Sequence, residues 1–141
     1  MKWYFAGRVR HKEKLKEIFK YLEMKGEIVV SDWVYEGSHK PYSENLEKVQ
    51  VLARRVVTSL LDTDIFVLIS DPEGTDMFVE LGVCLGKSKI DPDSIRIYII
   101  GEYSKRSLMQ LHPSVQHFEN IQELFVKEKI EIGDFVLPDF S

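Results

Sequence analysis

Short apolar segments alternate along this chain with segments of helical periodicity, and that alternation limits the possible folds more than any other feature. Strands are predicted at residues 2–6, 27–31, 64–70 and 95–100, and helices at residues 12–25, 43–61 and 75–87. Strands and helices that alternate at this spacing form parallel sheets with helices on both faces. The sequence therefore predicts an α/β fold, a Rossmann-like or flavodoxin-like three-layer domain with a parallel sheet of four to five strands.

Two of the predicted helices have a continuous apolar face. The first ends before Gly26 and carries Leu15, Ile18, Phe19 and Leu22 on one side. The second is expected to begin after an N-cap at Ser43. Its apolar stripe consists of Leu46, Val49, Leu52, Ala53, Val56, Val57, Leu60 and Leu61. Both faces are typical of helices that cover a sheet.

The last third of the chain is less regular. It is expected to contain a helical turn at 107–111, a short edge strand at 115–118, a helix at 121–129 and an apolar tail at 135–140. No internal repeat, linker or low-complexity segment is present. Residues 1–141 are therefore interpreted as a single domain.

The composition excludes several classes of partner and site. A net charge of −4 gives no general attraction to nucleic acid or to an anionic membrane. The single cysteine excludes an internal disulfide and a multi-cysteine zinc site, and it favours a reducing compartment. The N-terminus is charged too early for a signal peptide, and no apolar run has the length of a membrane span. We expect a cytoplasmic protein without a membrane or nucleic-acid partner.

The common cofactor and nucleophile motifs are absent. The sequence has neither a Gly-x-Gly-x-x-Gly turn after the first strand nor a P-loop, and it lacks the Gly-x-Ser-x-Gly elbow of hydrolases. The four histidines do not have metal-ligand spacing. We therefore expect no cofactor and no metal, and chemistry based on carboxylates.

Glu80 is the strongest candidate for that chemistry, because it lies on a short helix that is otherwise largely apolar. A carboxylate in such a place is costly unless something uses it. The alternative is that the helix dipole or a lysine outside the helix stabilises Glu80 and that it has no catalytic role.

The segment from Asp71 to Gly82, with its Gly-containing turn and its Glu-Leu-Gly helix, resembles the signature of the nucleoside 2-deoxyribosyltransferase family. Similar matches are found at residues 4–7, 41–45 and 64–68, which correspond to the first strand, the start of the second helix and the third strand. The C-terminal part of the chain has no counterpart in the resemblance.

The resemblance implies that Glu80 attacks the anomeric carbon of a nucleoside and forms a covalent glycosyl-enzyme ester, as in retaining glycosidases. Tyr4 would orient Glu80, although a core aromatic is the alternative. The enzyme would be a hydrolase if water then takes the sugar, and a transferase if a second base takes it. The resemblance also implies a homodimer or higher homo-oligomer, for which the apolar tail at 135–140 is a suitable contact.

The turn after the third strand offers further candidates. Asp71, Gly74, Thr75 and Asp76 lie where backbone N–H groups and a hydroxyl are available to bind sugar oxygens or a phosphate. An ordinary turn with Thr75 or Asp76 as N-cap is the alternative. In the loop after the second strand, Trp33 and His39 are candidates to stack on or close over a base.

One departure from the family concerns proton transfer. The family has an aspartate in the second helix, assisting departure of the base, where this chain has Val56. Arg55 is adjacent but lies about 100° round the helix. Either Asp71 or Asp76 supplies the proton, or the leaving group needs little help, or the reaction has been lost.

Gly7, Arg8 and Arg10 follow the first strand and resemble the Gly-x-x-Arg segment that binds phosphate in deoxynucleoside 5'-monophosphate N-glycosidases. The serine of that branch is replaced by Arg8, and a solvated turn is the alternative. The predicted function is cleavage or transfer at the N-glycosidic bond of a nucleoside or nucleoside 5'-monophosphate. A catalytically impaired nucleotide-binding or sensing module and an NAD-cleaving glycosidase are the alternatives.

Overall fold

The computed structural model describes residues 1–141 and contains one five-stranded sheet in which every pair of neighbouring strands is parallel. The strands are β1 (Lys2–Ala6), β2 (Ile28–Val29), β3 (Ile65–Ile69), β4 (Arg96–Ile100) and β5 (Val115–Phe118). Their order is β2-β1-β3-β4-β5. The predicted three-layer α/β fold is therefore confirmed, and the carboxyl ends of β1 and β3 form the switch point where such sheets bind ligands.

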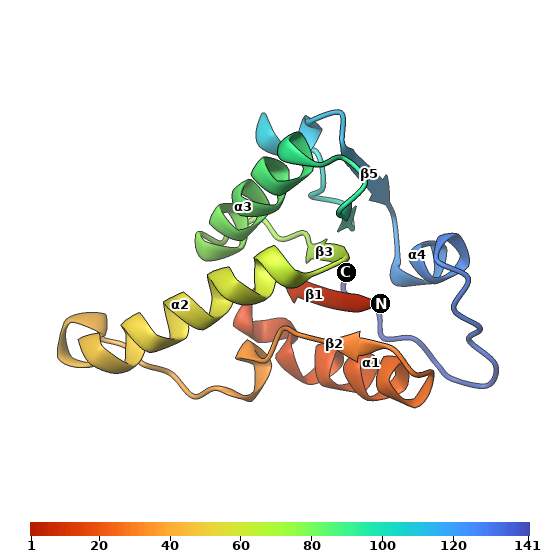
Figure 1. The fold of residues 1–141 in the computed structure, drawn as a ribbon. Helices are drawn as coiled ribbons and strands as arrows, with labels where there is room; N and C mark the ends of the chain where they lie inside the picture. The colour runs from red at the N-terminus through yellow and green to blue at the C-terminus, as the bar shows by residue number, and fades with distance from the viewer.

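Four α-helices complete the layers (Figure 1). They are α1 (Lys12–Met24), α2 (Leu46–Asp62), α3 (Asp76–Ile90) and α4 (Ile121–Lys127). The buried residues of α1 and α4 form one core with one face of the sheet, while those of α2 and α3 form a second core with the other face. Single 3-10 turns occur at Val9–His11, Trp33–Tyr35, Tyr42–Glu44 and Met109–Leu111.

The alternation of side chains along β1 decides which residues reach each core. Trp3 and Phe5 point into the α1/α4 core, whereas Tyr4 and Ala6 point into the α2/α3 core. Tyr4 is fully buried, and its ring stacks on that of Phe66 in β3 at a centroid distance of 6.0 Å. Tyr4 therefore faces the helix that carries Glu80.

Helix α2 differs from the prediction at its N-terminus. Ser43 is not the N-cap, because residues 42–44 form a separate 3-10 turn and the helix begins at Leu46, after Asn45. The Asn45 side chain donates to the carbonyl oxygens of His39 and Pro41 and so holds the preceding loop.

The apolar stripe of α2 is mostly uncovered within the single chain. Leu60 is the one buried residue of the helix, whereas Leu46, Val57 and Leu61 are 57%, 45% and 55% exposed. Only the C-terminal part of the stripe meets the sheet.

The C-terminal segment, residues 130–141, folds back along α1. Ile132, Phe135 and Phe140 pack against the α1/α4 core, and the Phe135 ring stacks on Tyr21 at 4.2 Å. The Tyr21 hydroxyl donates to the carbonyl oxygen of Ile132 at 2.7 Å. The apolar tail at 135–140 thus packs largely on its own chain while Val136 is 85% exposed, and its contact with a second subunit stays a prediction.

Candidate functional site

Tyr4 and Glu80 form a polar pair inside the α2/α3 layer. The Tyr4 hydroxyl and the Glu80 carboxyl lie close enough that each shifts the pKa of the other. Tyr4 Oη and Glu80 Oε2 are nevertheless both buried without a hydrogen bond of ordinary geometry. Buried polar atoms in native proteins are nearly always satisfied. The two oxygen atoms therefore have no protein partner outside the pair that they form with each other.

The protonation of the pair follows from its burial. Loss of solvent raises the pKa of Glu80 to about 7, the neighbouring Tyr4 hydroxyl opposes that rise, and the negative charge of Asp76 adds to it. Burial also raises the pKa of Tyr4, and the Glu80 carboxylate adds to that increase. At neutral pH, Glu80 therefore exists as a mixture of acid and carboxylate while Tyr4 remains a donor.

The surroundings of the pair offer no second candidate nucleophile, and the catalytic role of Glu80 stays a prediction. Cys84, one helical turn further on, is buried, and burial raises the pKa of its thiol to about 12, so the thiol stays protonated. Val56 packs against the apolar cluster that contains Tyr4. No acid is thus present at that position to protonate a departing group.

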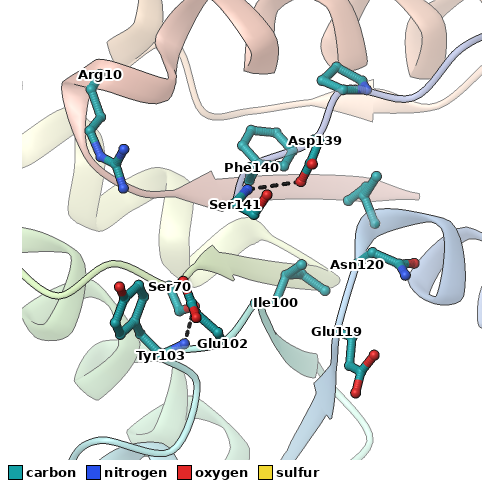
Figure 2. Close-up of a pocket in the computed structure, with 13 residues that line it drawn as sticks. Arg10, Ser70, Ile100, Glu102, Tyr103, Glu119, Asn120, Asp139, Phe140 and Ser141 are labelled. Carbon is teal, nitrogen blue, oxygen red and sulfur yellow. Dashed lines mark hydrogen bonds between the residues drawn. The ribbon is translucent and has the colours of Figure 1, made fainter.

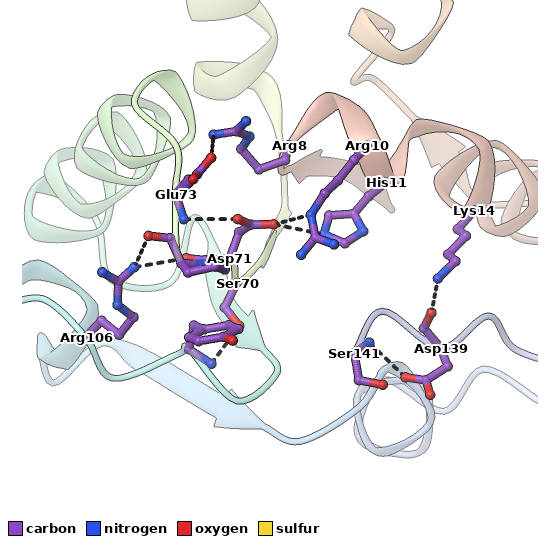
Figure 3. A network of polar contacts seen from close by, with 12 residues as sticks. Arg8, Arg10, His11, Lys14, Ser70, Asp71, Glu73, Arg106, Asp139 and Ser141 are labelled. Carbon is purple, nitrogen blue, oxygen red and sulfur yellow. Dashed lines mark hydrogen bonds and ion pairs between the residues drawn. The ribbon is translucent and has the colours of Figure 1, made fainter.

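Asp71 is the centre of a second polar network, at the carboxyl ends of β1 and β3 (Figure 3). Its buried carboxylate accepts from Arg10 Nε at 2.6 Å and from the backbone N–H of Glu73 at 3.0 Å, and His11 Nε2 lies 3.3 Å away. Burial opposes ionisation of Asp71, but the Glu73 N–H, Arg10 and His11 outweigh it and lower the pKa. The carboxylate that the sequence proposed as catalytic is thus held by the turns around it, and its catalytic role stays a prediction.

The two arginines proposed for a phosphate lie beside this network. Arg10 is paired with Asp71, and Arg8 Nη1 lies 3.3 Å from Glu73 Oε2. Arg10 is 56% and Arg8 38% exposed, so both guanidinium groups keep access to a ligand. Their turn begins at Gly7, where an added Cβ would lie 3.5 Å from Ile69 Cβ.

The turn into α3 places its predicted residues at the helix start. Gly74 has φ of +127°, a backbone conformation that other residues rarely adopt, so a substitution there would be strained. Thr75 precedes the helix without a side-chain capping bond, and Asp76 is its first residue. Both are exposed, and only Asp76 influences the pKa of Glu80.

Trp33 and His39 are tied into the loop after β2. Trp33 Nε1 donates to the carbonyl oxygen of Phe5 at 2.7 Å, so the indole anchors this loop to β1. His39 Nε2 lies 3.5 Å from Glu36 Oε2. Stacking of either side chain on a base stays a prediction.

Sequence reasoning missed the ion pairs that join this loop to α2. Arg55 Nε lies 3.1 Å from Asp32 Oδ2, and Arg55 Nη2 donates to Glu36 Oε1 at 2.5 Å. The only signal in the sequence was Arg55 itself. It was considered only as a neighbour of Val56, the position of the family's aspartate, and not as a partner for acidic residues of the loop.

A cavity of about 500 Å³ opens at the carboxyl ends of β3 and β4, between these strands and the C-terminal segment (Figure 2). Arg10, Ser70, Tyr103, Asn120 and residues 138–141 are among its lining residues. Tyr4 and Glu80 are not part of the lining. Tyr103 and Asn120 were not predicted because the C-terminal part of the chain carried no recognised motif, and Ser70 was assigned only to the end of the third strand.

The structure contains no group of three or more His, Cys, Asp or Glu side chains arranged to hold a metal ion. None of its helices combines the length and the apolar character needed to cross a membrane.

No protein-family model matches the chain, and no curated protein matches it by sequence. Among solved structures, the fold is similar to that of the CMP N-glycosidase BcmB from Clostridium botulinum. The two chains are 14% identical with a TM-score of 0.58, over 93% of this chain and 100% of the other. At this identity the likeness is one of fold, and it agrees with the three-layer domain expected from the resemblance to nucleoside deoxyribosyltransferases.

Proposed function

We propose that this protein cleaves or transfers the N-glycosidic bond of a nucleoside or nucleoside 5'-monophosphate, with Glu80 as the nucleophile. The observation that carries the proposal is the pair of buried, unpartnered oxygen atoms on Tyr4 and Glu80. The similarity of the fold to a CMP N-glycosidase supports the same reaction class. Tyr4 would hold the Glu80 carboxyl in the orientation for attack.

In the first step, a Glu80 oxygen forms a bond to C1' of the sugar while the C1'–N bond breaks and its electron pair leaves with the base. In the second step, water or another base attacks C1' and releases the Glu80 carboxylate. The departing base takes up one proton. Asp71 is engaged by Arg10 and His11, so the exposed Asp76 beside Glu80 is the remaining candidate, and it would relay that proton from solvent to the base.

We further propose that Arg8 and Arg10 bind the 5'-phosphate of a nucleotide substrate. Both are partly exposed at the carboxyl end of β1, where anions are commonly held in folds of this kind. A phosphate would take over part of the charge now provided by Glu73 and Asp71.

The assembly is proposed to be a homodimer or higher homo-oligomer in which α2 forms the contact. Leu46, Val51, Val57 and Leu61 are each at least 45% exposed on that helix, and Val79 of α3 is 67% exposed. Uncovered apolar side chains of this number on adjoining helices are typical of a protein interface.

The test is the release of free base from a panel of deoxyribo- and ribonucleosides, their 5'-monophosphates and NAD, followed by chromatography. The wild-type protein is expected to release base from at least one nucleoside or nucleotide, and Glu80→Gln to release none. Glu13→Gln, which changes an exposed carboxylate on α1 away from the site, is the matched control and should retain activity. Full activity of Glu80→Gln would overturn the proposal.

Val56 supports one alternative, a nucleotide-binding module that has lost turnover. This alternative predicts that wild-type protein and Glu80→Gln bind the same nucleotide and that neither releases base. Calorimetric titration of both proteins with the panel distinguishes it from the enzyme.

A further inference from the structure

A cluster of four charged or titratable side chains lies beside the proposed reaction site and has no role in the steps described above. It consists of Asp32, Glu36, His39 and Arg55. The first three belong to the loop that runs from β2 to the N-terminus of α2 in Figure 1, and Arg55 is a residue of α2. Arg55 is held on two sides, by Asp32 Oδ2 at 3.1 Å and by Glu36 Oε1 at 2.5 Å.

The cluster lies on the Tyr4 side of the sheet. Trp33, which follows Asp32, is fixed to the carbonyl oxygen of Phe5, the neighbour of Tyr4 in β1. Val56, which follows Arg55, packs in the apolar cluster that contains Tyr4. The negative charge of Asp32 is also among the groups that act on the Tyr4 hydroxyl. Asp32 and Arg55 thus lie at the edge of the layer that contains Tyr4 and Glu80.

Both side chains remain available to a ligand. The Asp32 side chain is 50% and the Arg55 side chain 40% exposed. The Arg55 guanidinium is fixed at one end by Glu36, so its plane is set before a ligand arrives. Asp32 uses Oδ2 for this ion pair, which leaves Oδ1 as a free acceptor.

An ionised carboxylate only accepts hydrogen bonds, and a guanidinium only donates them. Arg55 Nε is buried against Asp32 and Nη2 donates to Glu36, so the remaining Nη N–H groups are the donors left for a ligand, with Asp32 Oδ1 as the acceptor. Cytosine has the complementary edge, an amino donor at N4 beside an acceptor at N3, and adenine has the same arrangement at N6 and N1. Uracil and hypoxanthine have the reverse arrangement, a carbonyl acceptor beside an N–H donor. Uracil or hypoxanthine would therefore place its carbonyl acceptor against the Asp32 carboxylate and its N–H donor against the Arg55 guanidinium.

We propose that the Asp32–Arg55 pair determines base specificity by reading the amino edge of cytosine or adenine and by rejecting uracil and hypoxanthine. This inference rests on the proposed glycosidic function and names the bases that the site accepts. Rejection follows from unpaired and opposed polar groups, which discriminate more strongly than a lost contact alone.

The test compares kcat/KM for two matched pairs of substrates, CMP against UMP and AMP against IMP, which differ only at the edge of the base. In at least one pair, the amino-bearing substrate is expected to be preferred by about tenfold or more, the range of a two-point polar contact. The amide of Asp32→Asn presents a donor as well as an acceptor. The ratio of kcat/KM between the amino-bearing substrate and its partner should therefore fall toward unity, mainly through a change in KM. Glu13→Gln, which alters an exposed ion pair on α1, is the control and should keep the wild-type ratio.

The same four nucleotides are titrated calorimetrically into Glu80→Gln, so that the ratio is also measured without turnover. Glu80-dependent release with equal kcat/KM within both pairs would overturn the inference and leave the proposed function intact. Binding without turnover, with the amino-base preference present in Kd, would overturn the enzyme and support the inference. Absence of both binding and release would overturn both. Because wild-type ratios decide these outcomes, they do not depend on the folding of the Asp32 variant.

Discussion

At the scale of single residues, the proposed reaction depends on Glu80, whose burial disfavours the ionised form of its carboxyl group and raises its pKa. Glu80 Oε2 and Tyr4 Oη are buried without partners, and such pairs are rare in interiors that have no function to serve. The chain keeps a polar pair in a layer that is otherwise packed with apolar side chains.

The pH dependence of turnover follows from the raised pKa of Glu80. The carboxylate is the nucleophile, so kcat/KM for a nucleoside substrate should rise as pH increases through about 7, where Glu80 loses its proton. Tyr4→Phe removes the hydroxyl that lowers this pKa, so the rise should move to higher pH. Tyr42→Phe, at an exposed position, is the control. A value of kcat/KM that stays constant from about pH 5 to about pH 8 would contradict the assignment of Glu80 as the nucleophile.

The same group makes stability depend on pH. The pKa of Glu80 is about 7 in the folded protein against 4.5 for an unperturbed glutamate, so folding favours the protonated form. Stability from this group is complete below pH 4.5 and is lost as pH rises through 7, by about 3 kcal/mol in total. Glu80→Gln cannot ionise and avoids this loss. Urea unfolding at several pH values should therefore show the variant gaining stability over wild type as pH rises, and a constant difference would contradict this account.

At the scale of structural elements, the Asp71 network joins the turn after β1 to the turn after β3. Asp71→Asn removes the charge that compensates Arg10 and removes an acceptor for His11. We expect a loss of about 2–3 kcal/mol in the free energy of unfolding, because a buried partner is removed. The wild-type contribution should itself disappear in acid, since the lowered pKa means that it is present above the unfolded value of 3.8 and is lost below it.

Asp62→Asn serves as the control for this measurement, because Asp62 is 58% exposed in its ion pair with Lys2. A pair of that kind contributes little, about 0–1 kcal/mol. Equal losses in the two variants would show that the Asp71 network does not stabilise the fold.

The elements that were predictable from sequence are those with a regular apolar pattern. The strands around Phe66 and Ile99 and the amphipathic α1 were found because burial on one or both faces imposes a visible periodicity. The start of α2 was missed because Ser43 is a good N-cap in sequence but lies in a 3-10 turn. The role of the tail was missed because apolar residues without periodicity do not indicate which surface they cover.

The candidate site divides in the same way. Glu80 and Tyr4 were found because a carboxylate in an apolar helix and the resemblance pointed to them. The ion pairs of Arg55 with Asp32 and Glu36 depend on how a long loop folds against a helix, and no local pattern encodes that contact. The cavity beside the C-terminal segment was likewise missed, because it forms only when residues 138–141 return to the ends of β3 and β4.

At the scale of the whole molecule, the uncovered face of α2 predicts self-association. Val57→Glu places a charge on the apolar stripe without disturbing the buried Leu60, so it should shift the protein toward the monomer and reduce turnover if a second subunit completes the site. Sedimentation velocity measures this change. Gln50→Glu adds the same charge at another exposed position of α2 and is the control. A wild-type protein that sediments as a monomer would contradict the proposed assembly.

The most direct test of the central claim is to look for the covalent intermediate on Glu80. The protein is incubated with a 2'-fluoro nucleoside, in which fluorine slows both steps by destabilising the charged transition states, and is then digested and analysed by mass spectrometry. The account predicts a fluoropentosyl adduct on the peptide that contains Glu80 and none in Glu80→Gln. Base release without an adduct at Glu80, or an adduct on another residue, would contradict it.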